Sequence, residues 1–220
     1  MEKIEQNWKI QVHNEEPLYP FLVVDNWYLP QEEKAIWAEL NYYSSLPKEL
    51  LDRAETTVVA KNKDGSPKGK SFRFYINDYY AHNVRQISPS INTMYKFRTP
   101  EFHNIIDENF KPYSRSFITS NGDNTMISYY DKNDEYETHH DTMLWTMLIW
   151  MAKEPFAFEG GDFELTDNGC TIKMKNNRMV AFPSCLEHRV TPLKFKNKNE
   201  EFGLGKYTIT HFFFTLPNGI

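Results

Sequence analysis

Short apolar segments separated by turn residues dominate the second half of the chain. β-Branched and aromatic residues are frequent in these segments, and the breaks between them contain pairs such as Gly160-Gly161 and Asn176-Asn177. This pattern is typical of β-strands joined by tight turns. Strands at such regular intervals indicate a β-sandwich or a barrel-like pair of sheets. We predict seven strands, at residues 125–130, 143–151, 162–165, 171–174, 178–182, 190–193 and 206–215.

The first half of the chain mixes helical and extended patterns. Residues 17–28 begin with apolar and β-branched residues and predict a strand that runs into a turn. A helix should follow from Pro30, because proline is favoured in the first helical turn and acidic residues come early in the run QEEKAIWAELNYY. Two further short helices are expected around Pro100, within residues 88–109.

Residues 44–80 contain two more predicted strands, at 57–61 and 71–77, joined by the sequence NKDGSPKGK. Glycine, proline and serine in this linker predict a mobile, hairpin-like loop. Lysines at positions 61, 63, 68 and 70 could contact an acidic partner, although a solvated loop is the favoured interpretation.

Composition narrows the class of protein. A chain of 220 residues suits one domain with a sizeable core, and an aromatic content of 15% indicates an aromatic-lined interior or cleft. The formal charge of −5 argues against broad binding to phosphate backbones, so nucleic acid is a disfavoured partner. Two cysteines, Cys170 and Cys185, supply neither a disulfide framework nor a four-cysteine zinc site. With no signal-peptide-like or membrane-spanning apolar stretch, we expect a soluble cytoplasmic protein.

The stretch MISYYDKNDEYETHHD, residues 126–141, contains the strongest chemical signal. In an extended segment, side chains two residues apart point the same way, so His139 and Asp141 can bind one ion. His188, in AFPSCLEHRVTP, is the candidate for a second histidine ligand. Two histidines and a carboxylate form the facial triad of non-haem iron(II) oxygenases. An HxD pair alone also occurs in polar loops, but the order of the half-site, Gly-Gly, Phe-Pro-Ser and His188 favours a metal site.

These motifs together resemble the 2-oxoglutarate and iron(II)-dependent oxygenase superfamily, in its prolyl 4-hydroxylase-like branch. The resemblance covers residues 125–215 and implies a double-stranded β-helix, also called a jelly roll or cupin-like fold, with helices packed outside. We therefore expect a mainly β protein of the α+β class, with one oxygenase domain over residues 1–220. Residues 1–120 would supply helices, supporting strands and a substrate loop at 44–80, and residues 121–220 the core. The matching residues are Tyr129, Tyr136, His139, Asp141, Gly160, Gly161, Phe182-Pro183-Ser184, the run from His188 to Pro192, and Lys206.

By this resemblance, His139, Asp141 and His188 hold Fe(II), which 2-oxoglutarate chelates, and Lys206 binds the far carboxylate of the co-substrate. Period-two alternation in KYTITHFF places Lys206 on the same face as Thr208 and Phe212, with Tyr207 and His211 on the other face. The polar link after His188 is longer than usual in the family, so Lys194 and Lys196 stay as competitors for the carboxylate.

Other pocket residues follow from the same resemblance. Tyr129 is expected to hold the co-substrate, Thr146 to face the same pocket, and Trp150 to shape its wall. Side chains at the mouth, where the primary substrate would dock, are Tyr136, His140, Trp145 and Arg189.

The resemblance implies an Fe(II)- and 2-oxoglutarate-dependent dioxygenase that uses O2 to hydroxylate an unactivated C–H bond, with ascorbate as a further candidate cofactor. A prolyl residue of a protein or peptide is the first candidate substrate. A free amino acid or other small metabolite is the alternative, since one core serves many substrates. A non-catalytic, cupin-like metal-binding protein is the rival from another class. Lys206 and Tyr129 distinguish the two, because a metal holder needs no deep cation.

Overall fold

A large antiparallel sheet lies in the middle of the molecule. The computed structural model describes residues 7–14, 20–80, 82–197 and 201–217. Within them, eight strands form this sheet in the order β1-β2-β11-β7-β14-β5-β4-β3, and every neighbouring pair is antiparallel. These strands are β1 (Lys9–His13), β2 (Phe21–Asp25), β3 (Asp52–Arg53), β4 (Phe72–Tyr75), β5 (Gly122–Tyr130), β7 (Trp145–Met151), β11 (Arg178–Pro183) and β14 (Lys206–Phe214).

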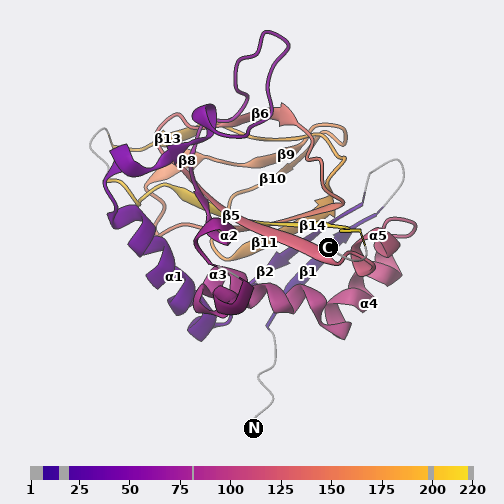
Figure 1. The fold of residues 1–220 in the computed structure, drawn as a ribbon. Helices are drawn as coiled ribbons and strands as arrows, with labels where there is room; N and C mark the ends of the chain where they lie inside the picture. Colours follow the sequence, from indigo (N-terminus) through magenta and orange to yellow (C-terminus); the bar gives the residue numbers. More distant parts are fainter. Residues whose placement is uncertain (1–6, 15–19, 81, 198–200, 218–220) are drawn as a thin grey trace.

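A smaller sheet lies over one face of the large one (Figure 1). Its order is β10-β9-β12-β6, and a separate pair, β13-β8, lies beside it. The two facing sheets form a jelly roll, which confirms the predicted fold class. The strands of the smaller sheets are β6 (Tyr136–His139), β8 (Phe158–Gly160), β9 (Phe163–Leu165), β10 (Cys170–Ile172), β12 (His188–Val190) and β13 (Leu193–Phe195).

Helices cover the other face of the large sheet (Figure 1). Proline lies in the first turn of the three helices that begin at Pro30, Pro89 and Pro100, and the hydroxyls of Ser88 and Thr99 cap the last two by accepting N–H bonds at 3.3 Å. The described helices are α1 (Pro30–Ser45), α2 (Ile76–Tyr79), α3 (Pro89–Asn92), α4 (Pro100–Asn109) and α5 (Ser114–Ile118), with 3-10 turns η1 (Lys48–Leu50), η2 (Ala54–Thr56), η3 (His82–Ile87) and η4 (Thr93–Arg98).

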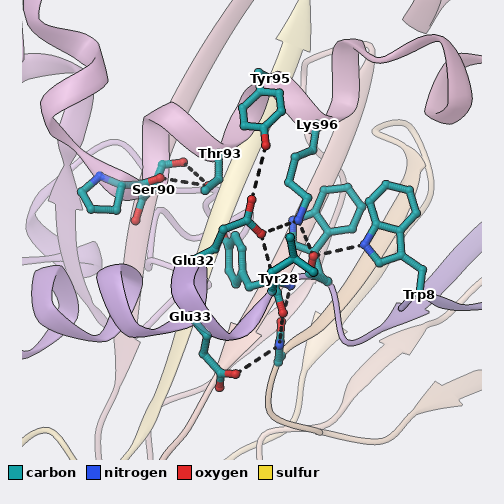
Figure 2. Close-up of polar contacts among 12 residues, drawn as sticks. Trp8, Tyr28, Glu32, Glu33, Ser90, Thr93, Tyr95 and Lys96 are labelled. Carbon is teal, nitrogen blue, oxygen red and sulfur yellow. Dashed lines mark hydrogen bonds and ion pairs between the residues drawn. The ribbon is translucent and has the colours of Figure 1, made fainter. Parts of the chain in front are cut away.

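A buried lysine joins α1 to η4 (Figure 2). Lys96 Nζ donates to the main-chain oxygen of Trp27 at 2.5 Å and to Glu32 Oε2 at 2.6 Å. Trp8 Nε1 donates to the same Trp27 oxygen at 3.1 Å, and the Trp27 ring lies 5.0 Å from the ammonium group. Glu32 also accepts from the Leu29 N–H at the start of α1. This cluster fixes the helical layer against the strand that precedes it.

Alternation along the central strands sorts side chains between the two faces of the large sheet. In β7, Met147 and Ile149 pack in the core under the helices, whereas Leu148 and Trp150 pack in the core between the sheets. All seven residues of β7 are buried. Whether a residue of β5, β7 or β14 has an even or an odd number therefore decides whether its side chain faces the space between the sheets or the helices.

Two predicted strands are wrong. Residues 57–61 form no strand, only a bridge at Lys61, because their polar groups are used elsewhere: the Ala60 N–H bonds Tyr136 and the Val58 carbonyl bonds Arg73. Residues 190–193 are divided between β12 and β13, since Pro192 has no N–H to donate and interrupts the ladder.

Candidate active site

His139, Asp141 and His188 converge between the sheets. His139 ends β6 and lies directly opposite His188, which begins β12. Asp141 follows β6, and its N–H donates to the Ser184 carbonyl at 2.9 Å. One candidate ligand atom from each residue lies within 4.8 Å of the others, and the imidazole Nε2 atoms are 3.8 Å (His139) and 3.7 Å (His188) from the Asp141 carboxylate oxygens. The pairing of β6 with β12 thus brings together ligands that are far apart in sequence.

Main-chain carbonyls fix the tautomer of both histidines. His139 Nδ1 lies 2.8 Å from the Glu137 oxygen, and His188 Nδ1 lies 2.8 Å from the Leu186 oxygen. Because a carbonyl only accepts, Nδ1 carries the proton in each ring and the Nε2 lone pair is free to bind a metal. Burial lowers the pKa of His139 to about 3, which keeps this ring neutral. Two neutral imidazoles and one carboxylate are a donor set that suits iron(II).

A bulge in β6 places an aromatic ring beside the metal ligands. Val190 pairs with Tyr136 while His188 pairs with His139, so β6 has one residue more than β12 over this stretch. Tyr136 and His139 consequently both point inward, and their rings stack with centroids 3.5 Å apart. The Tyr136 hydroxyl accepts the Ala60 N–H at 3.2 Å, which ties the ring to the loop before β4.

The three candidate ligands open into a mainly apolar pocket between the sheets. Even-numbered residues of β5 and β14 form its floor, as the alternation of the large sheet requires. The pocket is lined by Met126, Ser128, Tyr130, Tyr136, Leu148, Phe163, Val190, Thr208, Thr210 and Phe212, together with the three candidate ligands.

Lys206 lies on the same face of β14 as this pocket and has no exposed surface. Its Nζ donates to the Gly161 carbonyl at 2.6 Å and lies 4.6 Å from the centre of the Trp150 ring. No carboxylate in the described part of the chain forms an ion pair with it. Burial lowers the pKa of Lys206 to about 7, and the nearby Asp162 opposes this shift. Lys194 and Lys196, the alternatives considered from sequence, are both exposed.

The Gly-Gly turn is required by this packing. Both glycines have positive φ, and a side chain on Gly160 would begin 2.2 Å from the Pro192 carbonyl. A side chain on Gly161 would begin 3.3 Å from the Lys206 side chain, so the absence of a Cβ lets the lysine reach the main-chain oxygen at this turn.

The structure corrects the expectation for Tyr129. This tyrosine points to the helical side of the large sheet, where its hydroxyl accepts the N–H groups of Gly203 and Gly205 at 2.8 and 2.9 Å. Tyr130, its neighbour, faces the pocket and lies across from Lys206 in the strand pairing. Sequence reasoning missed Tyr130 because either residue of a Tyr-Tyr pair can match the family motif. The pairing of β5 with β14 is needed to show which of the two tyrosines faces the pocket.

Thr146 faces the pocket side, but its hydroxyl contacts a candidate metal ligand. Its Oγ1 donates to Asp141 Oδ2 at 2.7 Å and lies 2.8 Å from Ser184 Oγ. The Thr146 hydroxyl proton is thus used by the aspartate, and a contact of Thr146 with the co-substrate stays a prediction. Thr208, in contrast, lies on the pocket face of β14, and its buried hydroxyl has no hydrogen-bond partner among the residues that the structure describes.

The four residues expected at the mouth have different positions. Tyr136 lines the pocket, and His140 is exposed immediately beside the candidate ligands. Trp145 was wrongly placed, because its odd position in β7 buries it under the helices, where Nε1 donates to Ser116 Oγ at 3.1 Å. Arg189 does not line this pocket and pairs with Glu164 at 2.5 Å. It lines a separate hollow of about 430 Å³ with Tyr136 and Lys68, so its role toward a substrate stays a prediction.

Arg73 is a pocket-side cation that the sequence analysis did not identify. It pairs with Ser128 across β4 and β5, is 5% exposed, and lies 5.6 Å from the Tyr136 ring. Its Nη1 donates to the Val58 carbonyl at 2.7 Å, and its buried Nε has no hydrogen-bond partner among the described residues. A single arginine in a short strand gives no sequence signal for such a position.

The lysine-bearing loop is solvated at Lys61, Lys63 and Lys70, as expected, but its second half around Lys68 is bonded to β6. It projects beside β6 (Figure 1), where Glu137 N–H donates to the Lys68 carbonyl at 2.9 Å and Lys70 N–H donates to the Glu135 carbonyl at 2.8 Å. Lys68 Nζ also donates to the Thr138 carbonyl at 2.5 Å. The loop therefore extends the smaller sheet at the strand that carries His139.

Comparison with known families agrees with this geometry. Residues 125–214 match the family described as the 2OG-Fe(II) oxygenase superfamily. The matched segment contains the three candidate metal ligands and Lys206. This match covers about two fifths of the chain, and over those residues the chain is similar to Fe(II)- and 2-oxoglutarate-dependent dioxygenases. The match agrees with the predicted family and with Fe(II), 2-oxoglutarate and O2 as the predicted cofactors. A comparison with curated protein sequences gives no match.

Solved structures show the same fold at low sequence identity. A prolyl-4-hydroxylase from Pseudomonas putida has 14% identity and a TM-score of 0.55, and the alignment covers 96% of this chain and 94% of that one. A viral collagen prolyl hydroxylase from Paramecium Bursaria Chlorella virus-1 has 12% identity, a TM-score of 0.51 and coverage of 90% and 96%. OsALKBH1 has 8% identity, a TM-score of 0.52 and coverage of 90% and 100%. Across the described residues, no helix has the length and apolar character needed to cross a membrane.

Proposed function

We propose that this dioxygenase hydroxylates a prolyl residue of a peptide or protein, and that residues 1–220 act as one oxygenase unit. His139, Asp141 and His188 hold Fe(II), and Lys206 with Thr208 binds the far carboxylate of 2-oxoglutarate. When bound, the iron and the co-substrate supply the oxidation: one oxygen atom of O2 enters the C–H bond as hydroxyl, and the other enters succinate as 2-oxoglutarate loses CO2. The protein orients these groups and excludes water.

The uncompensated charge of Lys206 is the observation that supports the oxygenase site best. Within the described residues, the fully buried ammonium group of Lys206 has one hydrogen-bond partner, the Gly161 carbonyl, and such burial is unfavourable unless a carboxylate supplies the opposite charge. The unpartnered hydroxyl of Thr208 lies on the same face of β14 and offers the same ligand a hydrogen bond. A protein that only held a metal would need neither group, so the pair favours the oxygenase over a non-catalytic cupin-like protein.

Arg73 supports a substrate with a carbonyl or carboxylate oxygen. Its partly unpaired guanidinium lies beside Tyr136, which stacks on His139. The main-chain carbonyl of a prolyl residue would accept from Arg73 while the ring approached the metal past apolar side chains such as Met126 and Phe212. The similarity of the fold to prolyl hydroxylases agrees with this substrate. The same cation would also pair with the carboxylate of a free amino acid, which is the second candidate.

Co-substrate binding tests the pocket assignment. 2-Oxoglutarate would be titrated into protein loaded with Mn(II), which replaces Fe(II) without turnover. Lys206→Met should weaken binding by about 30-fold or more, because loss of one partner of a buried charge pair costs about 2–5 kcal/mol. Lys194→Met, which removes an exposed lysine from the same region, should bind as the wild type does. Equal affinity in wild type and Lys206→Met would overturn the assignment of the far carboxylate.

Substrate class is tested by turnover. Proline-containing peptides and free amino acids would be incubated with the Fe(II) protein, 2-oxoglutarate and O2, and succinate and product mass would be measured. A peptide that gains the mass of one oxygen atom on proline supports the first proposal. Hydroxylation of free amino acids alone supports the second.

A further inference from the structure

Two buried hydroxyl groups link Asp141 to the large sheet. Thr146 Oγ1 lies 2.7 Å from Asp141 Oδ2 and 2.8 Å from Ser184 Oγ. Thr146 and Ser184 are completely buried. The Asp141 N–H also donates to the Ser184 carbonyl at 2.9 Å. Ser184 therefore holds the aspartate through its main chain and, by way of Thr146, through its side chain.

The direction of these bonds follows from counting protons. An ionised carboxylate only accepts, so the single hydroxyl proton of Thr146 points to Asp141. The bond between the two hydroxyls must then be donated by Ser184. The order is Ser184 to Thr146 to Asp141, and each hydroxyl proton has one acceptor. Donation to an ionised acceptor makes the last of these bonds the strongest.

Strand pairing places the two hydroxyls together. Thr146 lies opposite Phe182 in the pairing of β7 with β11, and Ser184 follows Pro183 at the end of β11. The Ser184 N–H donates to the Leu144 carbonyl at 3.1 Å, which closes the turn beside the start of β7. The Phe-Pro-Ser sequence thus supplies a hydroxyl at a position fixed by the backbone.

We propose that Thr146, supported by Ser184, is a positioning residue that holds the Asp141 carboxylate in its orientation toward the two histidines. The bond from Thr146 goes to Oδ2, which lies 3.7 Å from His188 Nε2, while Oδ1 lies 3.8 Å from His139 Nε2. This inference rests on the proposed function only through the assignment of Asp141 as a metal ligand. A carboxylate whose orientation is fixed before the metal arrives should bind it more tightly than one that is free to rotate.

Metal affinity without co-substrate or substrate tests this role. Mn(II) would be titrated into wild type, Thr146→Val, Thr146→Ser and Thr125→Val. Thr146→Val should lose about 10- to 100-fold in affinity, the usual effect of removing a partner of a metal ligand. Thr146→Ser keeps the hydroxyl and should restore most of the affinity. Thr125 is also fully buried, but its hydroxyl lies 2.9 Å from His211 Nδ1 and it does not line the pocket, so Thr125→Val should bind Mn(II) as the wild type does.

Further variants separate the possible outcomes. Ser184→Ala should lose affinity by a few-fold, because the bond from Thr146 to Asp141 remains. Thr146→Ala would replace Thr146→Val if the valine variant fails to fold by circular dichroism. If Thr146→Val or Thr146→Ala folds and binds Mn(II) as tightly as the wild type, the inference is overturned. It is also overturned if Thr146→Ser binds Mn(II) no more tightly than Thr146→Val. Asp141→Ala is the reference: unchanged binding there would instead refute the proposed metal site.

Discussion

At the scale of single residues, Lys206 combines full burial with a charge that the described protein leaves unpaired. Its pKa is lowered to about 7 because burial disfavours the ammonium form. Trp150 and Tyr130 present aromatic faces to the ammonium group, and the Gly161 carbonyl accepts one of its protons. A dicarboxylate co-substrate would supply the missing negative charge. The protonation state of this lysine should therefore control co-substrate affinity near neutral pH.

Affinity and stability should respond to pH in opposite directions. Above pH 7 the free protein loses the Lys206 proton, so 2-oxoglutarate affinity should fall by up to about tenfold per pH unit. Between pH 7 and about 10.5 the unfolded chain binds more protons at this lysine than the folded chain, so the Lys206 contribution to stability should rise with pH. Titration calorimetry and urea unfolding at several pH values measure the two effects.

Lys206→Arg is the matched variant for this pH dependence, because guanidinium stays protonated throughout the range. Its affinity for 2-oxoglutarate should not fall between pH 7 and pH 9. An equal fall in wild type and the arginine variant would show that another group is responsible.

Residue-scale prediction from sequence depended on local spacing. The convergence of His139 and Asp141 followed from the two-residue repeat of an extended chain, and the pocket face of Lys206 and Thr208 followed from the same rule. This alternation could not choose between Tyr129 and Tyr130. It shows that the two side chains lie on opposite faces of the strand, but not which face meets the pocket, because that depends on the register between two strands. Arg73 was missed for a related reason: β4 reaches the site only through its pairing with β5.

At the scale of elements, the strands that are buried on both faces were the easiest to predict. β7 and β14 are long and apolar, and their observed limits differ little from the predicted ones. β6 was not predicted as a strand, since YETH is short and polar and its conformation depends on β12 and on the loop before β4. β6 also carries His139. The strand whose own sequence predicts it least well is therefore one that positions the site.

The cluster around Lys96 allows an element-scale prediction (Figure 2). Lys96→Met should lower the free energy of unfolding by about 3 kcal/mol, because it leaves Glu32 without its cation and the Trp27 carbonyl with one donor fewer. Lys34→Met, on the exposed side of α1, should change it by less than about 0.5 kcal/mol. Urea unfolding measures both. Equal stability of the two variants would mean that apolar packing alone holds α1 against η4.

At the scale of the whole molecule, the candidate site depends on both sheets. His139 and His188 come from the smaller sheet, whereas Asp141 is fixed by Thr146 and Ser184 at the end of the large sheet. Lys206 and Thr208 come from the centre of the large sheet. A metal that binds all three candidate ligands would therefore join the sheets in the folded protein and have no comparable site in the unfolded chain.

Metal binding should consequently stabilise the entire fold. Mn(II) at about 100 times its dissociation constant should raise the free energy of unfolding by about 2.7 kcal/mol, and a chelator should reverse the change. His188→Ala should abolish this increase because it removes one of the converging imidazoles. His140→Ala is the closest control, since it removes the exposed neighbour of His139 and should retain the full effect. Loss of stabilisation in His140→Ala, with retention in His188→Ala, would contradict the assignment of the ligands. Stabilisation that requires both His139 and His188 but not His140 would instead tie the metal to the paired ends of β6 and β12.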